Sequence, residues 1–309
     1  MDVTLQDRNT QSGLRPAAGQ VVNALTFDIE DYFHAAALEH AFGGAAWESL
    51  PSRVEANTRR LMDLLDESGV KATFFVLGWV AERNAGLVRE IHAREHEVAC
   101  HGYSHRLIYR QSPVEFRQET LRAKQLLEDT IGHPVQGYRA ASFSITGESV
   151  WALRIIREAG FEYDSSIFPI RHDRYGVPGA SRFVHRIDCG DSGELIEFPP
   201  STMKIGNLTL PVGGGGYFRL LPYWYTHLGL RRLNDIEGQP LMFYLHPWEV
   251  DTEQPVGKVG WLTRVRHYRN IHRCAERLRK LISAGSFAPV REILRSLRVV
   301  GSSVRYGEA

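Results

Sequence analysis

Short apolar runs alternate with segments of helical periodicity through the first half of the chain. The run "NALTFDI" at 23–29 is followed by "VEANTRRLMDLLDESG" at 54–69, where apolar residues recur at helical spacing from Val54 to Leu65. Apolar runs without polar alternation are typical of strands covered on both faces, as in parallel sheets. The pattern therefore predicts repeated βαβ units and an α/β fold.

The same rhythm continues to about residue 167. Further strands are expected at 70–78, 97–102, 135–140 and 161–167, and further helices at 84–96, 113–132 and 149–160. From about residue 168 the pattern loosens into short strands, a glycine-rich loop at 212–218 and an aromatic helix, until "QPLMFYLHPWE" at 239–249 restores a buried strand. The glycine-rich loop lacks a following GK[ST], so we interpret it as a tight loop and not as a phosphate cradle.

The segment 259–285 reads as one long basic amphipathic helix. The residues expected to face the core are Leu262, Val265, Ile271, Leu278 and Leu281. We interpret its arginine-rich side as a solvated face. Attraction of an anionic polymer or a lipid-linked phosphate is the alternative.

Composition narrows the class of partner. The 309 residues carry 37 Lys and Arg against 36 Asp and Glu, so a net charge of +1 gives no reason to expect nucleic acid as a partner. The three cysteines are widely separated, which fits a reducing compartment. The N-terminus lacks the pattern of a signal peptide and no stretch is apolar enough to span a bilayer. We therefore expect a cytoplasmic protein, with association at the inner face of the membrane left open.

Ionisable residues follow the expected strands. Asp28 closes the first strand, His101 follows "EVAC", Arg139 closes "VQGY", Asp164 lies in "FEYDSSI", and His246 follows "LMFYL". In a parallel α/β barrel the carboxyl ends of the strands share one face. These side chains are therefore expected to converge there.

Two histidines in "HGYSH" are candidate metal ligands. His101 and His105 are four residues apart on a strand-to-helix loop, and a solvated turn is the alternative interpretation. Two imidazoles with one carboxylate leave coordination positions open, as in a catalytic metal site. The carboxylate cluster of "TFDIED" supplies candidates for the third ligand.

The motifs "TFDIED", "HGYSH", "YRAASF", "YDSSI" and "LHPWE" resemble, in order and spacing, the five motifs of polysaccharide deacetylases, the NodB-homology or carbohydrate esterase family 4 enzymes. More narrowly, "GYFRLLPYWYT", "FYLHPWEVDTEQP" and "HYRNI" look like the branch found in exopolysaccharide gene clusters, which carries a C-terminal extension. The resemblance covers residues 20 to 290. It implies a distorted (β/α)7-type, TIM-like barrel with short extra strands and C-terminal helices.

The resemblance implies a division of the chain. Residues 1–20 would form a flexible N-terminus and 291–309 a C-terminal tail. Between them, 21–290 would form a single deacetylase barrel, with the family-specific extension beginning at about residue 168.

The resemblance also implies catalytic roles. Asp28 matches the catalytic base, Arg139 the residue that orients this base, and His246 the general acid. Asp164 matches the residue that tunes the acid histidine, although "DSS" also reads as an ordinary cap or turn. The family's backbone oxyanion donor falls near Ala141, where this chain lacks the family's proline.

The metal carboxylate is left open between Glu30 and Asp31. Family members carry it next to the base or two positions further on, and here the adjacent residue is Ile29. Strand alternation puts Glu30 on the side of Asp28, which favours Glu30, but the family's ligand is usually Asp. The implied cofactor is a divalent metal, in the first place zinc.

The implied reaction is hydrolysis of the N-acetyl group of an amino sugar in a polysaccharide, or in its lipid-linked or nucleotide-linked precursor. Aromatic residues near the motifs are candidates for sugar stacking. These residues are Phe33, Phe143, Tyr217 and Trp248. Two alternatives remain: a small cyclic amide or imide hydrolase of the allantoinase-like branch, and a non-catalytic glycan-binding module. Assembly into a homo-oligomer stays open.

Overall fold

A parallel sheet forms the centre of the protein in a computed structural model, which describes residues 15–16, 21–42, 47–172, 174–298 and 302–307. The strand order is β11-β2-β3-β4-β5-β6-β8-β7, and β12 also pairs with β2. All neighbours are parallel except the β7–β8 pair. The strands are β2 (Val22–Ile29), β3 (Thr73–Val76), β4 (Glu97–Cys100), β5 (Gly137–Tyr138), β6 (Tyr163–Asp164), β7 (His185–Asp188), β8 (Glu194–Glu197), β11 (Met242–Leu245) and β12 (Ser286–Ala288).

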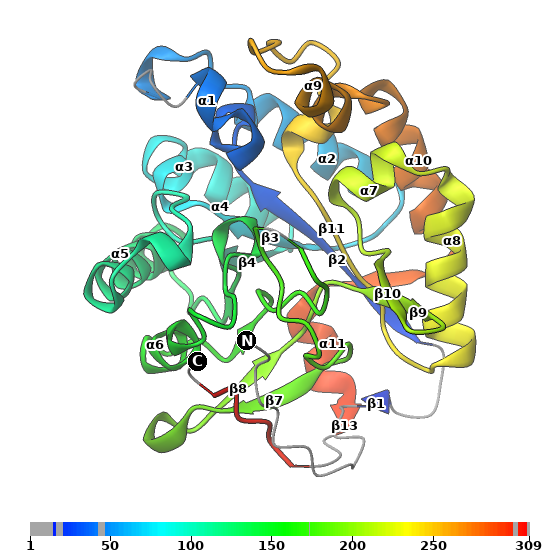
Figure 1. The fold of residues 1–309 in the computed structure, drawn as a ribbon. Coiled ribbons are helices and arrows are strands. Elements are labelled where there is room, and N and C mark those ends of the chain that lie inside the picture. Colours follow the sequence, from blue (N-terminus) through cyan, green and yellow to red (C-terminus); the bar gives the residue numbers. More distant parts are fainter. Residues whose placement is uncertain (1–14, 17–20, 43–46, 173, 299–301, 308–309) are drawn as a thin grey trace.

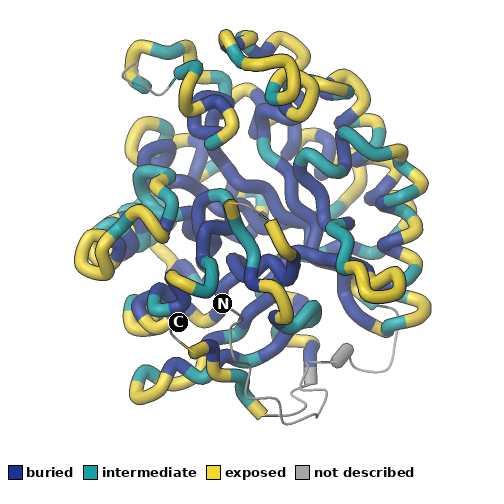
Figure 2. The backbone as a smooth tube through the Cα atoms, viewed as in Figure 1, coloured by how far each residue is buried: buried dark blue, intermediate teal, exposed yellow. Residues whose placement is uncertain are grey.

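Helices surround the outer side of this sheet, which curls into a half-barrel (Figure 1). The helices are α1 (Glu39–Phe42), α2 (Val54–Glu67), α3 (Gly78–Arg83), α4 (Ala85–Ala93), α5 (Pro113–Ile131), α6 (Trp151–Glu158), α7 (Gly215–Leu220), α8 (Tyr223–Arg231), α9 (Trp261–Tyr268), α10 (Ile271–Ser283) and α11 (Val290–Ser296). The central strands β2 to β6 and β11 are almost entirely buried, whereas the helices expose their outer sides (Figure 2). The predicted α/β barrel class is confirmed.

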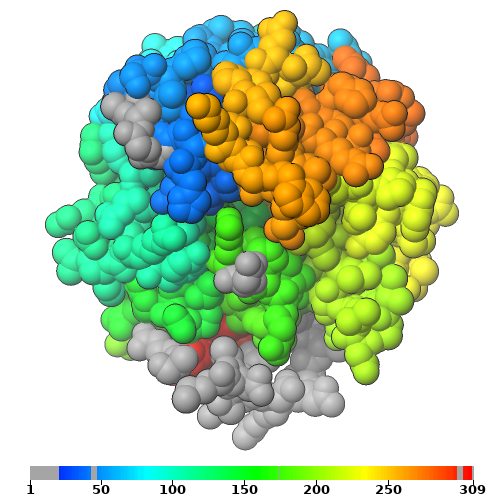
Figure 3. Space-filling model, turned by 45° about the horizontal axis from the view of Figure 1, so that its top comes forward, coloured from blue at the N-terminus to red at the C-terminus, as the bar shows by residue number. Residues whose placement is uncertain are grey.

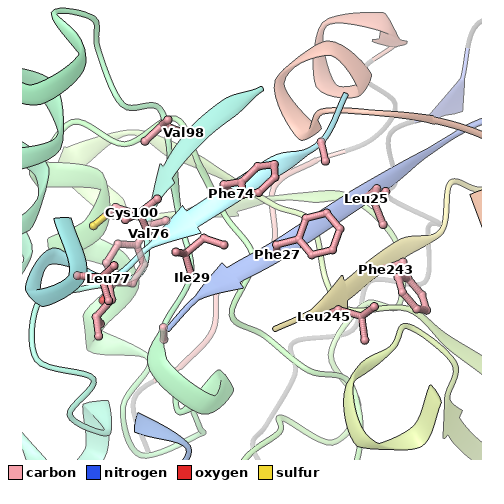
Figure 4. Packing of buried hydrophobic residues seen from close by; sticks show 14 of the residues in the cluster. Leu25, Phe27, Ile29, Phe74, Val76, Leu77, Val98, Cys100, Phe243 and Leu245 are labelled. Carbon is pink, nitrogen blue, oxygen red and sulfur yellow. The ribbon is translucent and has the colours of Figure 1, made fainter. Parts of the chain in front are cut away.

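Strand β2 is buried on both faces, and its successive side chains pack alternately into two different hydrophobic clusters. Leu25, Phe27 and Ile29 pack in the larger core, with residues of β3, β4 and β11 (Figure 4). Ala24 belongs instead to the smaller cluster inside the curled sheet. Since side chains alternate along a strand, Asp28 shares this inner side.

The C-terminal helical segment differs from the expectation of one long helix. It forms α9 and α10, separated at Asn270, which has a left-handed backbone with φ +60°. The apolar positions of α10 are buried as expected, but Leu262 and Val265 of α9 are 46% and 37% exposed. The prediction that these two residues face the core was wrong, because the break gives α9 its own orientation.

The remaining pairs are short. A hairpin joins β9 (Thr202–Ile205) to β10 (Leu208–Pro211), and β1 (Arg15–Pro16) pairs with β13 (Leu297–Arg298). Apart from Arg15 and Pro16, the expected flexible N-terminus lies outside the described residues. Most of the segment expected as a C-terminal tail is described, and it contains nearly all of α11 and the strand β13. Tyr306, near the C-terminus, is buried and places its hydroxyl 2.8 Å from Nε2 of His185. The division of the chain into these parts stays a prediction.

Candidate metal and catalytic site

The carboxyl ends of the parallel strands bring the candidate residues together. Asp28 lies near the end of β2 and Glu30 just after it. His101, Arg139 and His246 each follow directly after a strand, namely β4, β5 and β11. Asp28, Glu30, His101 and Arg139 are buried.

Arg139 holds one oxygen of Asp28. Its Nη1 donates to Oδ1 of Asp28 at 2.6 Å and to the Thr26 hydroxyl at 2.8 Å. Its Nη2 donates to the Ser165 hydroxyl, and its guanidinium lies 4.0 Å from the ring centroid of Phe75. Because the arginine is fully buried and held on several sides, it fixes the orientation of the Asp28 carboxylate.

Glu30, His101 and His105 form a group whose ligand atoms lie within 4.8 Å of one another. Oε2 of Glu30 is 2.6 Å from Nε2 of His105 and makes no other hydrogen bond among the described residues. Nδ1–H of His101 donates to the carbonyl of Arg139 at 2.9 Å, which leaves Nε2 of this ring as the ligand atom. A buried, unpartnered carboxylate oxygen beside two imidazoles fits a divalent cation.

The charges in this group favour the forms that bind metal. Burial alone would raise the pKa of Glu30, but the neighbouring His105 and the charge of His246 hold this pKa well below its usual range. Burial lowers the pKa of His101 to about 4. A carboxylate and a neutral imidazole are the ligand forms that zinc requires.

The structure uses Asp31 differently from Glu30. Oδ2 of Asp31 accepts hydrogen bonds from the Ser52 hydroxyl at 2.7 Å and from the backbone N–H groups of Arg53 and Val54 at 2.8 and 3.1 Å. Its Oδ1 accepts from the N–H of Tyr32. Oδ2 is therefore occupied in holding the start of α2 and Oδ1 in capping the turn at Tyr32, so the geometry favours Glu30 over Asp31 as the ligand.

His246 lies close to the carboxylates of both Asp28 and Glu30. Its Nε2 lies 3.8 Å from Oδ2 of Asp28 and 3.7 Å from Oε1 of Glu30, while its Nδ1–H donates to Oε1 of Glu249 at 2.8 Å. Burial would lower the pKa of His246, but the hydrogen bond and the nearby carboxylates raise it to about 9. His246 is therefore held in the protonated form that a general acid needs.

Glu249 is a site residue that we did not single out in the sequence. It is fully buried and forms an ion pair with Arg219, which is also buried and donates to the backbone carbonyl of His267. The signal was present in "LHPWE", because a 3-10 turn after β11 returns the fourth residue of "HPWE" to the histidine. The signal is the spacing of three residues between His246 and Glu249.

The contacts of Asp164 are with residues other than His246. Its carboxylate accepts a hydrogen bond from the hydroxyl of Ser166 at 2.6 Å, and its carboxyl group also interacts with the carboxyl group of Glu197. Burial raises the pKa of Asp164 to about 6 and that of Glu197 well above its usual value. Glu249, and not Asp164, is hydrogen-bonded to Nδ1 of His246, so the tuning role of Asp164 stays a prediction without a direct contact to support it.

Two of the four candidate aromatic residues, Trp248 and Tyr217, contact neighbouring side chains. Trp248 donates from Nε1 to Oε1 of Glu30 at 3.1 Å, and its two neighbours in a stack are His246 and His267, with ring centroids at 4.7 and 4.4 Å. Its flat faces are covered, so it supports the site and does not offer a sugar-stacking face as expected. Tyr217 places its hydroxyl 3.4 Å from that of Tyr175.

Two cavities meet beside the metal-ligand group. A cavity of about 250 Å³ is lined by Glu30 and His246 together with Phe143, Ser142 and Tyr175. A larger one of about 590 Å³ is lined by His105, Phe33, His34 and Trp47. Ala36 and Leu107 line both cavities, so the two cavities are neighbours, one beside His105 and one beside Glu30.

Two family models match consecutive parts of the chain. Residues 18–163 match the family model described as polysaccharide deacetylase. Residues 18–163 belong to the polysaccharide deacetylase family. Residues 165–295 match a domain of unknown function, DUF3473.

Curated relatives are similar to this chain over short regions. The chain is 32% identical over 76 residues to a peptidoglycan-N-acetylglucosamine deacetylase of Bacillus cereus, covering 25% of this chain and 28% of the relative. It is 30% identical over 95 residues to a chitooligosaccharide deacetylase of Bradyrhizobium, covering 31% and 43%. The chain thus matches less than half the length of these two relatives.

Solved structures share the fold over most of the chain. A crystal structure described as a putative polysaccharide deacetylase from Mycobacterium smegmatis superposes with a TM-score of 0.62, 20% identity and 93% coverage of both chains. A Puue allantoinase superposes with a TM-score of 0.59 and 16% identity, covering 96% of both. These similarities establish the fold. No helix within the described residues is long and apolar enough to cross a membrane.

Proposed function

We propose that the protein is a metal-dependent hydrolase that removes the N-acetyl group from an amino sugar of a glycan or of its lipid-linked or nucleotide-linked precursor. One observation carries this proposal: Asp28 and His246 lie beside the group of Glu30, His101 and His105, with Nε2 of His246 3.8 Å from Oδ2 of Asp28 and 3.7 Å from Oε1 of Glu30. A base and an acid beside one ligand group are what amide hydrolysis requires.

The residues divide the work of the reaction. Glu30, His101 and His105 would hold a divalent ion, in the first place zinc, since two imidazoles and a carboxylate leave a position open for water. The bound ion would lower the pKa of this water and polarise the acetyl carbonyl. Asp28 takes the proton from the attacking water at Oδ2, because Arg139 occupies its Oδ1.

The acid completes the cleavage of the amide. As the bond between the acetyl carbon and the sugar nitrogen breaks, His246 gives the proton on Nε2 to that nitrogen, so that a neutral amine and acetic acid leave. The acid ionises to acetate in water, and proton exchange with solvent returns Asp28 to its carboxylate and His246 to its protonated form. Glu249 keeps the proton on Nδ1 and thereby fixes the orientation of the ring. Burial of the Glu249–Arg219 ion pair holds this arrangement in place.

The substrate is proposed to be a glycan chain or precursor, used in exopolysaccharide biosynthesis. The two neighbouring cavities, one beside His105 and one beside Glu30, support a ligand of more than one ring. The deacetylases among the relatives act, by their names, on peptidoglycan and chitooligosaccharide. The second candidate is a small cyclic amide hydrolase, which is supported only by the fold shared with the allantoinase.

Release of acetate tests the proposal. N-acetylglucosamine oligomers, a nucleotide-linked N-acetyl sugar and allantoin would be offered to the wild type, to Asp28→Asn and to Asp63→Asn, whose exposed carboxylate serves as the matched control. We expect a chelator to abolish acetate release and Asp28→Asn to lower kcat by about 10²–10⁴-fold, with Asp63→Asn unchanged. Turnover that survives chelation, or opening of allantoin without acetate release, would refute the proposal.

A further inference from the structure

Helix α9 turns an apolar ridge outward. Trp261 is 77% exposed, and Leu262 and Val265 on the same helix are also exposed. At about 100° per residue these three positions fall within one sector of about 100°. His267, the buried residue of α9, lies on the opposite side of the helix. The apolar ridge therefore points away from the body of the protein.

Cations border this ridge on both edges. At the same angular step Arg264 falls on one edge and Arg266 on the other. Arg269 follows the helix, and Lys258 precedes it; all four side chains are exposed. None of them forms an ion pair with another residue in the described part of the chain. An exposed apolar centre with unpaired cations at its edges is the pattern of a helix that lies in a bilayer interface.

A second exposed apolar patch lacks this combination. Trp224 and Leu228 of α8 are 63% and 46% exposed. The arginines that follow them are neutralised, because Arg231 pairs with Asp235 and Arg232 with Glu237. Exposed apolar area alone therefore does not distinguish α9, whereas its free positive charge does.

The outward face of α9 is joined to the candidate active site. His267 on its inner side stacks on Trp248, which stacks on His246. Arg266 and His267 line the smaller cavity, and the hydroxyl of Tyr268 accepts from the N–H of Gly257 in the preceding loop. In Figure 3 the orange segment that contains α9 stands out from the surface next to the blue and green segments.

We propose that α9 and the loop before it dock the protein on an anionic phospholipid bilayer. The ridge would enter the interface while Lys258 and Arg264 contact lipid headgroups. A second copy of the chain is a poorer occupant, because it would bring two sets of unpaired cations together. Docking would present the smaller cavity to glycans linked to lipid in the same bilayer, a consequence that rests on the proposed deacetylase function.

Sedimentation with vesicles tests the docking without substrate or metal. The full chain would be mixed with vesicles of phosphatidylcholine alone or of an equimolar mixture with phosphatidylglycerol. We expect binding to the anionic vesicles only, weakening as salt is raised. Trp261→Ala should weaken it by at least about tenfold. Lys258→Gln and Arg264→Gln should each weaken it by about fivefold.

A matched control separates this face from apolar surface in general. The double variant Trp224→Ala/Leu228→Ala should bind the anionic vesicles as the wild type does. Failure of the full chain to sediment, equal loss in the α8 double variant, or dissociation of a dimer by Trp261→Ala would each overturn the proposal. Acetate release from soluble oligomers should be unchanged in Trp261→Ala. If no variant or wild type releases acetate while vesicle binding persists, the enzymatic proposal fails and the docking stands.

Discussion

Glu30→Gln and Asp31→Asn each remove one negative charge from adjacent buried residues, and we expect the two variants to fail in different ways. Oε2 of Glu30 faces His105 and makes no other hydrogen bond among the described residues. The Asp31 carboxylate accepts four hydrogen bonds, three of them from residues at and before the start of α2. The first variant should therefore damage metal binding, and the second the fold.

The expected magnitudes follow from these contacts. In Glu30→Gln the amide replaces the anionic ligand, and zinc affinity should fall by at least about 100-fold, or about 2.7 kcal/mol. The metal-free protein should keep its stability within about 1 kcal/mol, since the amide oxygen still accepts from Trp248. In Asp31→Asn an NH₂ group replaces one acceptor oxygen. A buried N–H then loses its partner, which should lower the free energy of unfolding by about 1–2 kcal/mol.

Two measurements on each variant make the comparison. Competition with a chromophoric chelator gives zinc affinity, and urea unfolding of the metal-free protein gives stability. We expect zinc affinity of Asp31→Asn within about twofold of the wild type, because none of its oxygens faces the ligand group. Equal loss of zinc affinity in both variants would refute the assignment of Glu30 and return Asp31 to the metal site.

Three further variants follow from the site and its surroundings. His246→Asn should lower kcat by about 10²–10⁴-fold in the acetate assay while zinc affinity is retained; loss of zinc affinity would instead make His246 a ligand. Glu249→Gln should lower kcat and also lower the free energy of unfolding by about 3–5 kcal/mol, because Arg219 is left buried without its partner; unchanged urea unfolding would contradict this. Burial lowers the pKa of His185 to about 4, against about 6.5 when unfolded, so the unfolded chain binds more protons between these values. The stabilisation by neutral His185 is therefore complete above pH 6.5, and the free energy of unfolding falls by about 3 kcal/mol as the pH falls to 4. Urea unfolding at both pH values should show this contribution. It should be absent in His185→Asn and present in the control His272→Asn, whose side chain is exposed.

The parallel strands, and the side of β2 on which its carboxylates lie, were predictable because they depend on local periodicity. Continuous apolar runs identified β2, β3, β4 and β11, and alternation along β2 placed Asp28 and Glu30 on one side. The preference for Glu30 therefore needed no knowledge of tertiary structure. The use of Asp31 as an anchor for α2 did need it, because its partners are more than twenty residues away in the chain.

The break between α9 and α10 was not predictable from hydrophobic spacing. The pattern is compatible with one helix through Asn270, and only this residue's left-handed backbone shows the change of direction. Asn adopts this conformation more readily than most residues do, but it also occurs inside helices. Similarly, the partner of His246 depended on a tight turn after β11 that propensities alone do not specify.

The ring stack of His246, Trp248 and His267 limits how the two matched segments can be inherited. The proposed base and metal ligands lie within residues 18–163, whereas the proposed acid and its supporting rings lie within 165–295. Recombination near residue 164 with another family member would therefore exchange a proton donor together with its whole support. The second segment is then no accessory, because its loss would remove the proposed acid together with the rings that hold it.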